Sequence, residues 1–184
     1  MFQIRVDDHI TLALLEQRHA PELFQMIDES RDTLRQWLPW VDATATVEDS
    51  VIHIQQTLQQ FANNQGYQLG ICYEGHIVGR VGMHGINRQN LSTSIGYWLS
   101  PKYEGKGIMT KSCAALLALC FTALDLERVE IRAAVDNSKS RAIPKRLGFV
   151  EEGCIRQGEY LYDKYVDLVV YGQLKKEWQA LQKS

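Results

Sequence analysis

Cysteine is scarce in this sequence, and its spacing offers no metal site. The cysteines are Cys72, Cys113, Cys120 and Cys154. They form no C-x-x-C pair, and none stands near a histidine at the spacing of metal ligands. Cys113 and Cys120 share one face of a helical pattern, which indicates core residues. We therefore expect reduced, structural thiols and no metal cofactor.

Long apolar runs and targeting signals are also lacking. No run approaches the roughly 20 apolar residues that span a bilayer. The first residues, MFQIRVDDHITLALL, contain acids and a base and have no basic start followed by an apolar core. This pattern predicts a cytoplasmic protein, in which the Asn90-Leu91-Ser92 glycosylation sequon has no use.

An excess of positive charge is absent as well, because the formal net charge is −2. That balance disfavours a general nucleic-acid binder and fits an enzyme that acts on a small molecule or a basic polypeptide. The chain has 184 residues and contains no linker, repeat or low-complexity tract. We therefore expect a single domain over residues 1–184.

The hydrophobic patterns predict an α+β (mixed α/β) fold in which helices and a mixed sheet share one core. Strands or hairpins are expected within 1–14, 67–86, 91–100, 128–135 and 151–174. Helices are expected over 21–38, 46–65, 108–124 and 175–182. One more short helix should end at Leu147 with Gly148 as its cap. Pro144 fits only the first turn of a helix, which places the start of this one near Ser140.

The stretch LSPKYEGKGIMTK, residues 99–111, joins an expected strand to an expected helix. Unpaired amides and the dipole at a helix start attract anions. Gly105 and Gly107 would let a ligand approach the backbone closely, and Lys106 and Lys111 add positive charge. A bound diphosphate would use all of these features, and a plain turn is the alternative. The spacing excludes both a Walker A loop and the G-x-G-x-x-G dinucleotide fingerprint.

Four segments resemble a known family. KYEGKGIMT resembles the pyrophosphate loop of the GNAT acyl-CoA N-acyltransferases, Q/R-x-x-G-x-G/A, with Lys102 in place of Gln or Arg. VDNSKSRAIPKRLGFVEEG resembles the family's N-x-x-S-x-x-x-x-x-x-L-G-F segment. DTLRQWLPWVD and GCIRQGEYLYDKYVDLVVYGQLKKEW resemble the RimL-type branch, which acetylates the N-termini of ribosomal proteins. The resemblance covers nearly the whole chain.

The resemblance implies the GNAT fold and acetyl-CoA as cosubstrate. The sheet would be mostly antiparallel, with helices on both faces, and the strands carrying residues 97–100 and 129–135 would part around the pantetheine arm. The implied cofactor-binding residues are Trp98, Leu99, Gly105, Lys106, Gly107, Ile108, Met109, Thr110 and Asn137. Asn137 would hydrogen-bond the pantetheine arm, and a turn residue before a helix is the alternative.

The resemblance also implies two catalytic residues. Ser140 matches a serine thought to protonate the departing thiolate, with a helix N-cap as the alternative. Glu159 matches the family's carboxylate base, with a solvated acid at a strand end as the alternative. The nearby tyrosines are further candidates for the acid: Tyr160, Tyr162 and Tyr165.

Three other residues are candidates for the acceptor site. Trp37 and Trp40 would form walls of a groove, with core packing as the alternative. His84 would be a base, with a structural strand histidine as the alternative.

These features lead to one main hypothesis: acetyl transfer from acetyl-CoA to a primary amine by direct attack in a ternary complex. The amine would be the N-terminal α-amino group of a protein, with ribosomal proteins as the first candidates. The alternatives are a small amine, such as a polyamine or an antibiotic, and a CoA-binding sensor or interaction protein without turnover. Nucleic-acid and membrane partners are not expected, and the exposed strand edges allow a homo-oligomer.

Overall fold

The structure is a computed structural model that describes residues 2–183. Its strands are β1 (Gln3–Arg5), β2 (Ile10–Leu14), β3 (Tyr67–Tyr73), β4 (His76–Asn87), β5 (Ser92–Leu99), β6 (Arg128–Ala134), β7 (Val150–Leu161) and β8 (Lys164–Leu174). Its α-helices are α1 (Ala20–Glu29), α2 (Arg31–Leu34), α3 (Val47–Ala62), α4 (Ile108–Phe121), α5 (Ser138–Arg146) and α6 (Lys175–Leu181). These elements confirm the predicted α+β fold class.

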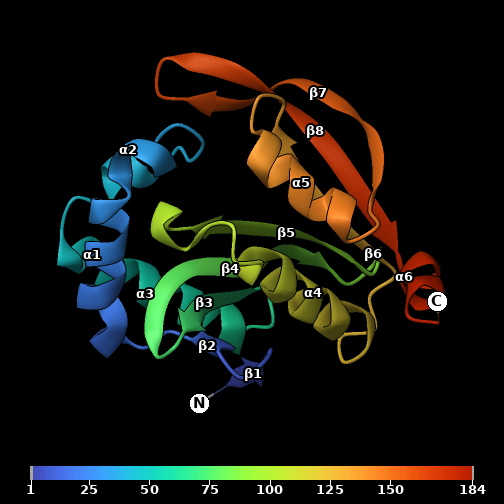
Figure 1. Ribbon diagram of the computed structural model, residues 1–184, viewed down its shortest axis with the longest axis horizontal. Coiled ribbons are helices and arrows are strands. Elements are labelled where there is room, and N and C mark those ends of the chain that lie inside the picture. Colours follow the sequence, from blue (N-terminus) through green and yellow to red (C-terminus); the bar gives the residue numbers. More distant parts are fainter. Residues whose placement is uncertain (1, 184) are drawn as a thin grey trace.

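All described strands form one sheet of eight, in the order β1-β2-β3-β4-β5-β6-β8-β7. Neighbouring strands are antiparallel except β5 and β6, which are parallel. Helix α4 packs on one face of the sheet, and α1 and α3 pack on the other (Figure 1). Side chains of β5 point to alternate faces of the sheet, so the strand contributes to both cores. Ile95 lies in the core with α4, and Trp98 lies in the core with α1.

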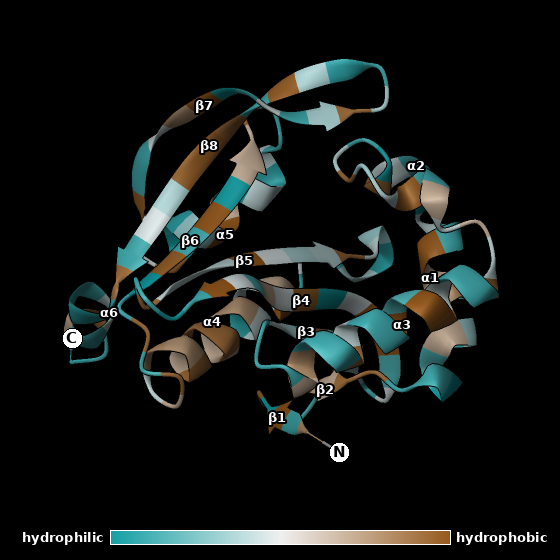
Figure 2. Ribbon diagram, turned by 180° about the vertical axis from the view of Figure 1, so that it is seen from behind, coloured by the Kyte–Doolittle hydropathy of each residue, from teal (hydrophilic) through white to brown (hydrophobic). Residues whose placement is uncertain are grey.

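The sheet opens between β5 and β6, as the family resemblance implies. The two strands pair over only three positions, from Ser92 opposite Arg128 to Ser94 opposite Glu130. Beyond this point β5 stays on β4 as far as Leu99, and β6 stays on β8 as far as Ala134. The two halves of the sheet therefore diverge, which Figures 1 and 2 show as the gap between β5 and the β7–β8 arm.

Short-range signals set several elements. Thr46 and Asp49 form a capping box at the start of α3. Glu74 and Gly75, both with positive φ, make the tight turn between β3 and β4. Helix α4 is apolar on nearly every side, as its colouring in Figure 2 shows, and buries both Cys113 and Cys120.

Two helix boundaries differ from the sequence prediction. The helix expected over 21–38 is divided into α1 and α2 at Ser30, and Trp37 lies beyond α2. The short helix α5 starts at Ser138, so Pro144 lies inside it and not in its first turn. Pro144 is tolerated there because the carbonyl that loses its helical partner, that of Ser140, accepts a hydrogen bond from the Tyr97 hydroxyl.

No helix in the described part of the chain is long and apolar enough to cross a membrane.

Candidate active site

The glycine loop presents bare backbone amides at the start of α4. Gly105 and Gly107 have φ of 76° and 73°, and a Cβ placed on either would meet no atom within 4 Å. Gly107 is the N-cap and has no side chain with which to cap the helix. The amides from Gly105 to Thr110 donate to no described residue. The first turn of α4 also carries no acid. This loop therefore fits an anion such as a diphosphate.

The lysines around the loop differ in their partners. Lys111 pairs with Asp7 at 2.7 Å, and Lys102 pairs with Glu29 at 2.6 Å. The hydrogen bond from Lys111 helps lower the pKa of Asp7 to about 2. Lys106 has no carboxylate partner among the described residues, and its Nζ lies 5.2 Å from the centre of the Tyr73 ring. Lys106 is therefore the lysine of this loop that remains available to a bound anion.

The strand β5 turns backbone groups toward the gap at alternate residues. The Ser100 N–H donates to the Val78 carbonyl at 2.9 Å, which sets the hydrogen-bonding phase between β4 and β5. In that phase the backbone groups of Trp98 point toward β4, and those of Tyr97 and Leu99 point into the gap. The indole of Trp98 is also buried, 6.1 Å from the ring of Trp40. The strand pairing thus favours Leu99 over Trp98 as the residue that contacts a ligand in the gap.

The start of α5 lies at the end of β6, on the other side of the gap. Asn137 is the N-cap, and its side-chain oxygen accepts the Ser140 N–H at 3.1 Å. This geometry matches the turn-residue alternative for Asn137 and leaves its NH₂ group for a ligand. Ser140 is the third residue of α5, so the alternative that it caps the helix is wrong.

The carboxylate of Glu159 lies on β7, opposite Val166 of β8. The side chain is half-buried and has neither a hydrogen bond nor an ion pair with any described residue. Burial without a partner raises its pKa above the ordinary value of 4.5. A carboxylate with a raised pKa and free oxygens is a stronger base than a solvated one.

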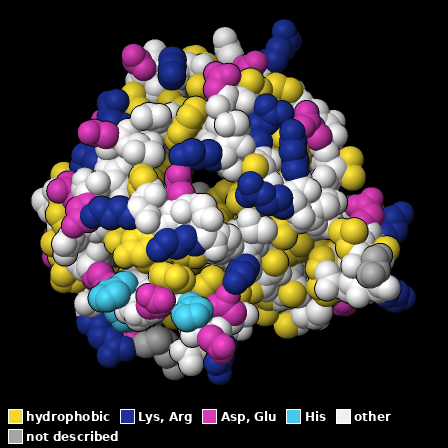
Figure 3. Space-filling model, in the orientation of Figure 1, with side chains coloured by type: hydrophobic (Ala, Val, Ile, Leu, Met, Phe, Trp, Pro, Cys, Tyr) yellow, Lys and Arg dark blue, Asp and Glu magenta, His cyan; other side chains and the backbone are white. Residues whose placement is uncertain are grey.

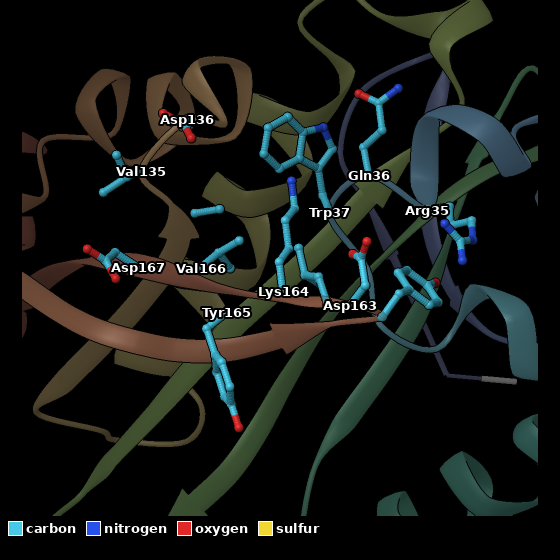
Figure 4. A pocket seen from close by; sticks show the side chains of 13 residues that line it. Arg35, Gln36, Trp37, Val135, Asp136, Asp163, Lys164, Tyr165, Val166 and Asp167 are labelled. Carbon is cyan, nitrogen blue, oxygen red and sulfur yellow. The ribbon is translucent and has the colours of Figure 1, made fainter.

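A cavity of about 620 Å³ opens at the wide end of the gap. It is lined by three segments: residues 35–37 after α2, residues 134–136 after β6, and residues 161–167 at the tip of the β7–β8 hairpin. Figure 3 shows a hollow on this face, and Figure 4 shows the Trp37 ring and the Lys164 side chain directed toward each other within the cavity. Trp37 thus lines a cavity, as a wall of an acceptor groove would.

The other two acceptor candidates lie elsewhere. Trp40 packs against Trp98 in the core beside α1, which matches its core-packing alternative. His84 lies on β4 near the paired ends of β5 and β6, with Gln68 Nε2 at 2.9 Å from its Nδ1. Neither residue lines the cavity, and their role in binding the acceptor stays a prediction.

One wall of the cavity is held by contacts between the tip of the β7–β8 hairpin and the segment after α2, which the sequence did not indicate. The Tyr162 hydroxyl donates to the Leu38 carbonyl at 2.7 Å, and the Arg35 guanidinium lies 3.8 Å above the Tyr162 ring. Arg35 is itself held by a bidentate pair with Asp42. These contacts join the hairpin tip to the segment after α2. Tyr162 therefore has a structural partner, and an acid role for it is disfavoured.

Replacing Tyr162 by phenylalanine should loosen this wall. The variant loses the hydrogen bond to Leu38, so we expect its free energy of unfolding, measured by urea titration, to fall by about 1 kcal/mol. Tyr160→Phe is the control, because its ring is about half exposed and its hydroxyl donates to no described residue. Equal stabilities of the two variants would contradict a role of the Tyr162 hydroxyl in holding the tip.

Comparisons with known proteins agree with this geometry. Residues 9–150 match the acetyltransferase (GNAT) domain family. A putative ribosomal N-acetyltransferase, YdaF of Bacillus subtilis, is 38% identical over 98% of this chain and 99% of its own. The ribosomal-protein-serine acetyltransferase of Escherichia coli is 29% identical over 93% of this chain and 96% of its own.

A solved structure extends the likeness to the fold. RimL, a ribosomal L7/L12 alpha-N-protein acetyltransferase in complex with coenzyme A, superposes with a TM-score of 0.91 at 29% identity. The match covers 94% of this chain and 98% of that one. The amide-rich loop and the parted sheet agree with these matches. The chain therefore belongs to the GNAT acetyltransferase family, with acetyl-CoA as its cosubstrate.

Proposed function

We propose that the protein acetylates the N-terminal α-amino group of a protein, with ribosomal proteins as the first candidates, in the cytoplasm. The observation that carries the proposal is the cavity at the wide end of the parted strands, since it gives a peptide end access to the gap. The similarity to YdaF and RimL over nearly the whole chain supports the same acceptor class.

The charge at the cavity suits a protonated amine. Asp136, Asp163 and Asp167 line it together with Lys164, and Arg35 is paired with Asp42. The carboxylates therefore exceed the unpaired cations at this site. A peptide N-terminus that arrives as an ammonium ion would be attracted by this excess.

Proton chemistry also favours an α-amine over a lysine. An α-amino group has a pKa near 7.7–8.0, so roughly a tenth of it is neutral at pH 7. A lysine amine, with a pKa near 10.4, is neutral in well under one part in a thousand. An α-amine therefore needs only a modest base, and we assign that role to Glu159, acting directly or through one water.

The remaining roles follow from position. The amides from Gly105 to Thr110 and the Lys106 ammonium would hold the diphosphate of acetyl-CoA, and Leu99 and Asn137 would hold its pantetheine arm. Bound acetyl-CoA supplies a thioester carbonyl that an amine can attack. The Leu99 N–H points into the gap and would stabilise the charge that develops on that oxygen. Ser140 would donate a proton to the departing sulfur, whose conjugate thiol has a pKa of about 8.5.

A panel of acceptors tests the proposal. Peptides with a free N-terminal serine or alanine should be acetylated in the presence of acetyl-CoA, as judged by mass spectrometry. The same peptides with a blocked N-terminus and an internal lysine should not react. Faster turnover of polyamines or aminoglycosides would favour a small-amine acetyltransferase. Binding of acetyl-CoA without transfer to any acceptor would favour the sensor alternative, and either result would overturn the proposal.

A further inference from the structure

Tyr97 links the two halves of the parted sheet. It lies on β5 beyond the last residue that pairs with β6, on the part of the strand that borders the gap. Its hydroxyl donates to the Ser140 carbonyl of α5 at 2.8 Å. Because α5 follows β6, this hydrogen bond runs from one side of the gap to the other. Tyr97 therefore fixes the main chain of Ser140 relative to β5.

Pro144 makes this link available. In a regular helix the Ser140 carbonyl would accept the N–H of the residue four positions later, but that residue is Pro144, which has no N–H. The carbonyl is therefore free to accept the Tyr97 hydroxyl. A partly buried carbonyl with no partner would be costly, so the tyrosine also compensates for the proline.

The hydroxyl protons of Tyr97 and Ser140 have a defined arrangement. Tyr97 has one hydroxyl proton, and it is committed to the Ser140 carbonyl. The Ser140 Oγ, 3.4 Å from the Tyr97 oxygen, must therefore be the donor in that second contact. Burial raises the pKa of Tyr97, so the phenol stays protonated. Tyr97 thus holds Ser140 without itself releasing a proton, and the long second contact lets the serine hydroxyl turn away at small cost.

We propose that Tyr97 is a positioning residue that places Ser140 for proton donation to the departing sulfur. The proposal rests on the role of Ser140 in the proposed function. The link requires both the tyrosine hydroxyl and a helix carbonyl left free by proline.

The first test of this proposal is the turnover rate of variants at Tyr97 and Ser140. Tyr97→Phe should lower kcat by about tenfold, the effect of losing one good hydrogen bond, with the acetyl-CoA affinity from calorimetry within about twofold of the wild type. Ser140→Ala should lower kcat at least as much. In the Ser140→Ala background, Tyr97→Phe should cause no further loss of kcat, because its effect passes through the serine.

Pro144→Ala separates positioning from stability. This substitution restores a backbone N–H that can bond to the Ser140 carbonyl but cannot connect it to β5. In the apo protein, Tyr97→Phe should lower the urea midpoint of unfolding, and it should lower it less when Pro144→Ala is also present. The kcat of Tyr97→Phe with Pro144→Ala should stay low relative to Pro144→Ala alone. Recovery of kcat together with stability would overturn the proposal, because the tyrosine would then have only a structural role.

The outcomes distinguish this inference from the proposed function. If Ser140→Ala is slow but Tyr97→Phe has the wild-type kcat, or if the two losses multiply, Tyr97 does not act through Ser140 and this inference alone fails. If Ser140→Ala turns over like the wild type, the acid role assigned to Ser140 fails and the positioning role fails with it.

Discussion

Gly107→Val should abolish measurable binding of acetyl-CoA while leaving the protein folded. Gly107 has a φ of 73°, a conformation that strains a β-branched residue by at least about 1–2 kcal/mol. Its Cβ would project into open space at the mouth of α4, where the ligand must approach the amides. Losing two charge-assisted hydrogen bonds would cost about 3 kcal/mol, so isothermal titration should show affinity lower by at least about a hundredfold.

Gly85→Val is the matched control for this experiment. Gly85 also has a positive φ, 60°, and a Cβ there would likewise meet no atom within 4 Å. It lies toward the end of β4 that is remote from the glycine loop, since β4 meets Leu99 at Gly79. The two variants should lose similar stability in urea, but Gly85→Val should keep its affinity for acetyl-CoA. Wild-type affinity in Gly107→Val would contradict the assignment of the diphosphate to this loop.

Glu159→Gln should lower kcat by about a hundredfold or more, the usual range for loss of a general base. The amide keeps the size of the side chain but cannot accept the amine proton. Acetyl-CoA affinity should stay close to that of the wild type, because Glu159 lies on β7 and not at the glycine loop. Glu48→Gln, at an exposed site in the first turn of α3, is the control and should keep the wild-type kcat.

The pH dependence of kcat gives a second test of Glu159. The base must be ionised, so kcat should rise with pH through the pKa of Glu159, which burial displaces upward from 4.5. This acidic limb should disappear in Glu159→Gln. A wild-type profile with no change between pH 4.5 and 9 would remove Glu159 from the mechanism.

Stability should depend on pH in the opposite direction. Because burial raises the pKa of Glu159 in the folded state, the native protein binds this proton more tightly than the unfolded chain does. The ionised group therefore destabilises the native state above its folded pKa, and the penalty is lost as pH falls toward 4.5. Glu159→Gln should accordingly be more stable than the wild type at neutral pH, with a difference that shrinks in acid.

Much of the framework could be predicted because its signals are local. The Thr46 and Asp49 capping box, the turn at Glu74 and Gly75, and the positive-φ glycines of the loop each depend on a few neighbouring residues. The ordered set of motifs then predicted the family, and the parting of β5 and β6 followed from it. The cofactor-binding and catalytic residues were proposed by the same resemblance, residue by residue.

The features that differ from the sequence prediction, or that it does not contain, depend on distant residues. The sequence predicts Pro144 at a helix start because no residue near it in the chain replaces the missing hydrogen bond. The substitute is Tyr97, which is 43 residues away from Ser140 in the sequence. The contact between Tyr162 and Leu38 spans 124 residues. No local pattern encodes such pairs, because they form only when the two halves of the sheet come together.

The sequence by itself determined most of the helices and strands, the glycine-rich loop and the chemistry available to the chain, since backbone conformation and side-chain type are properties of short segments. The tertiary structure alone decided which backbone groups of β5 face the gap, which tryptophan lines the cavity, and how Ser140 is held. Those features depend on strand phase and on contacts between distant segments, which are fixed only when the chain is folded.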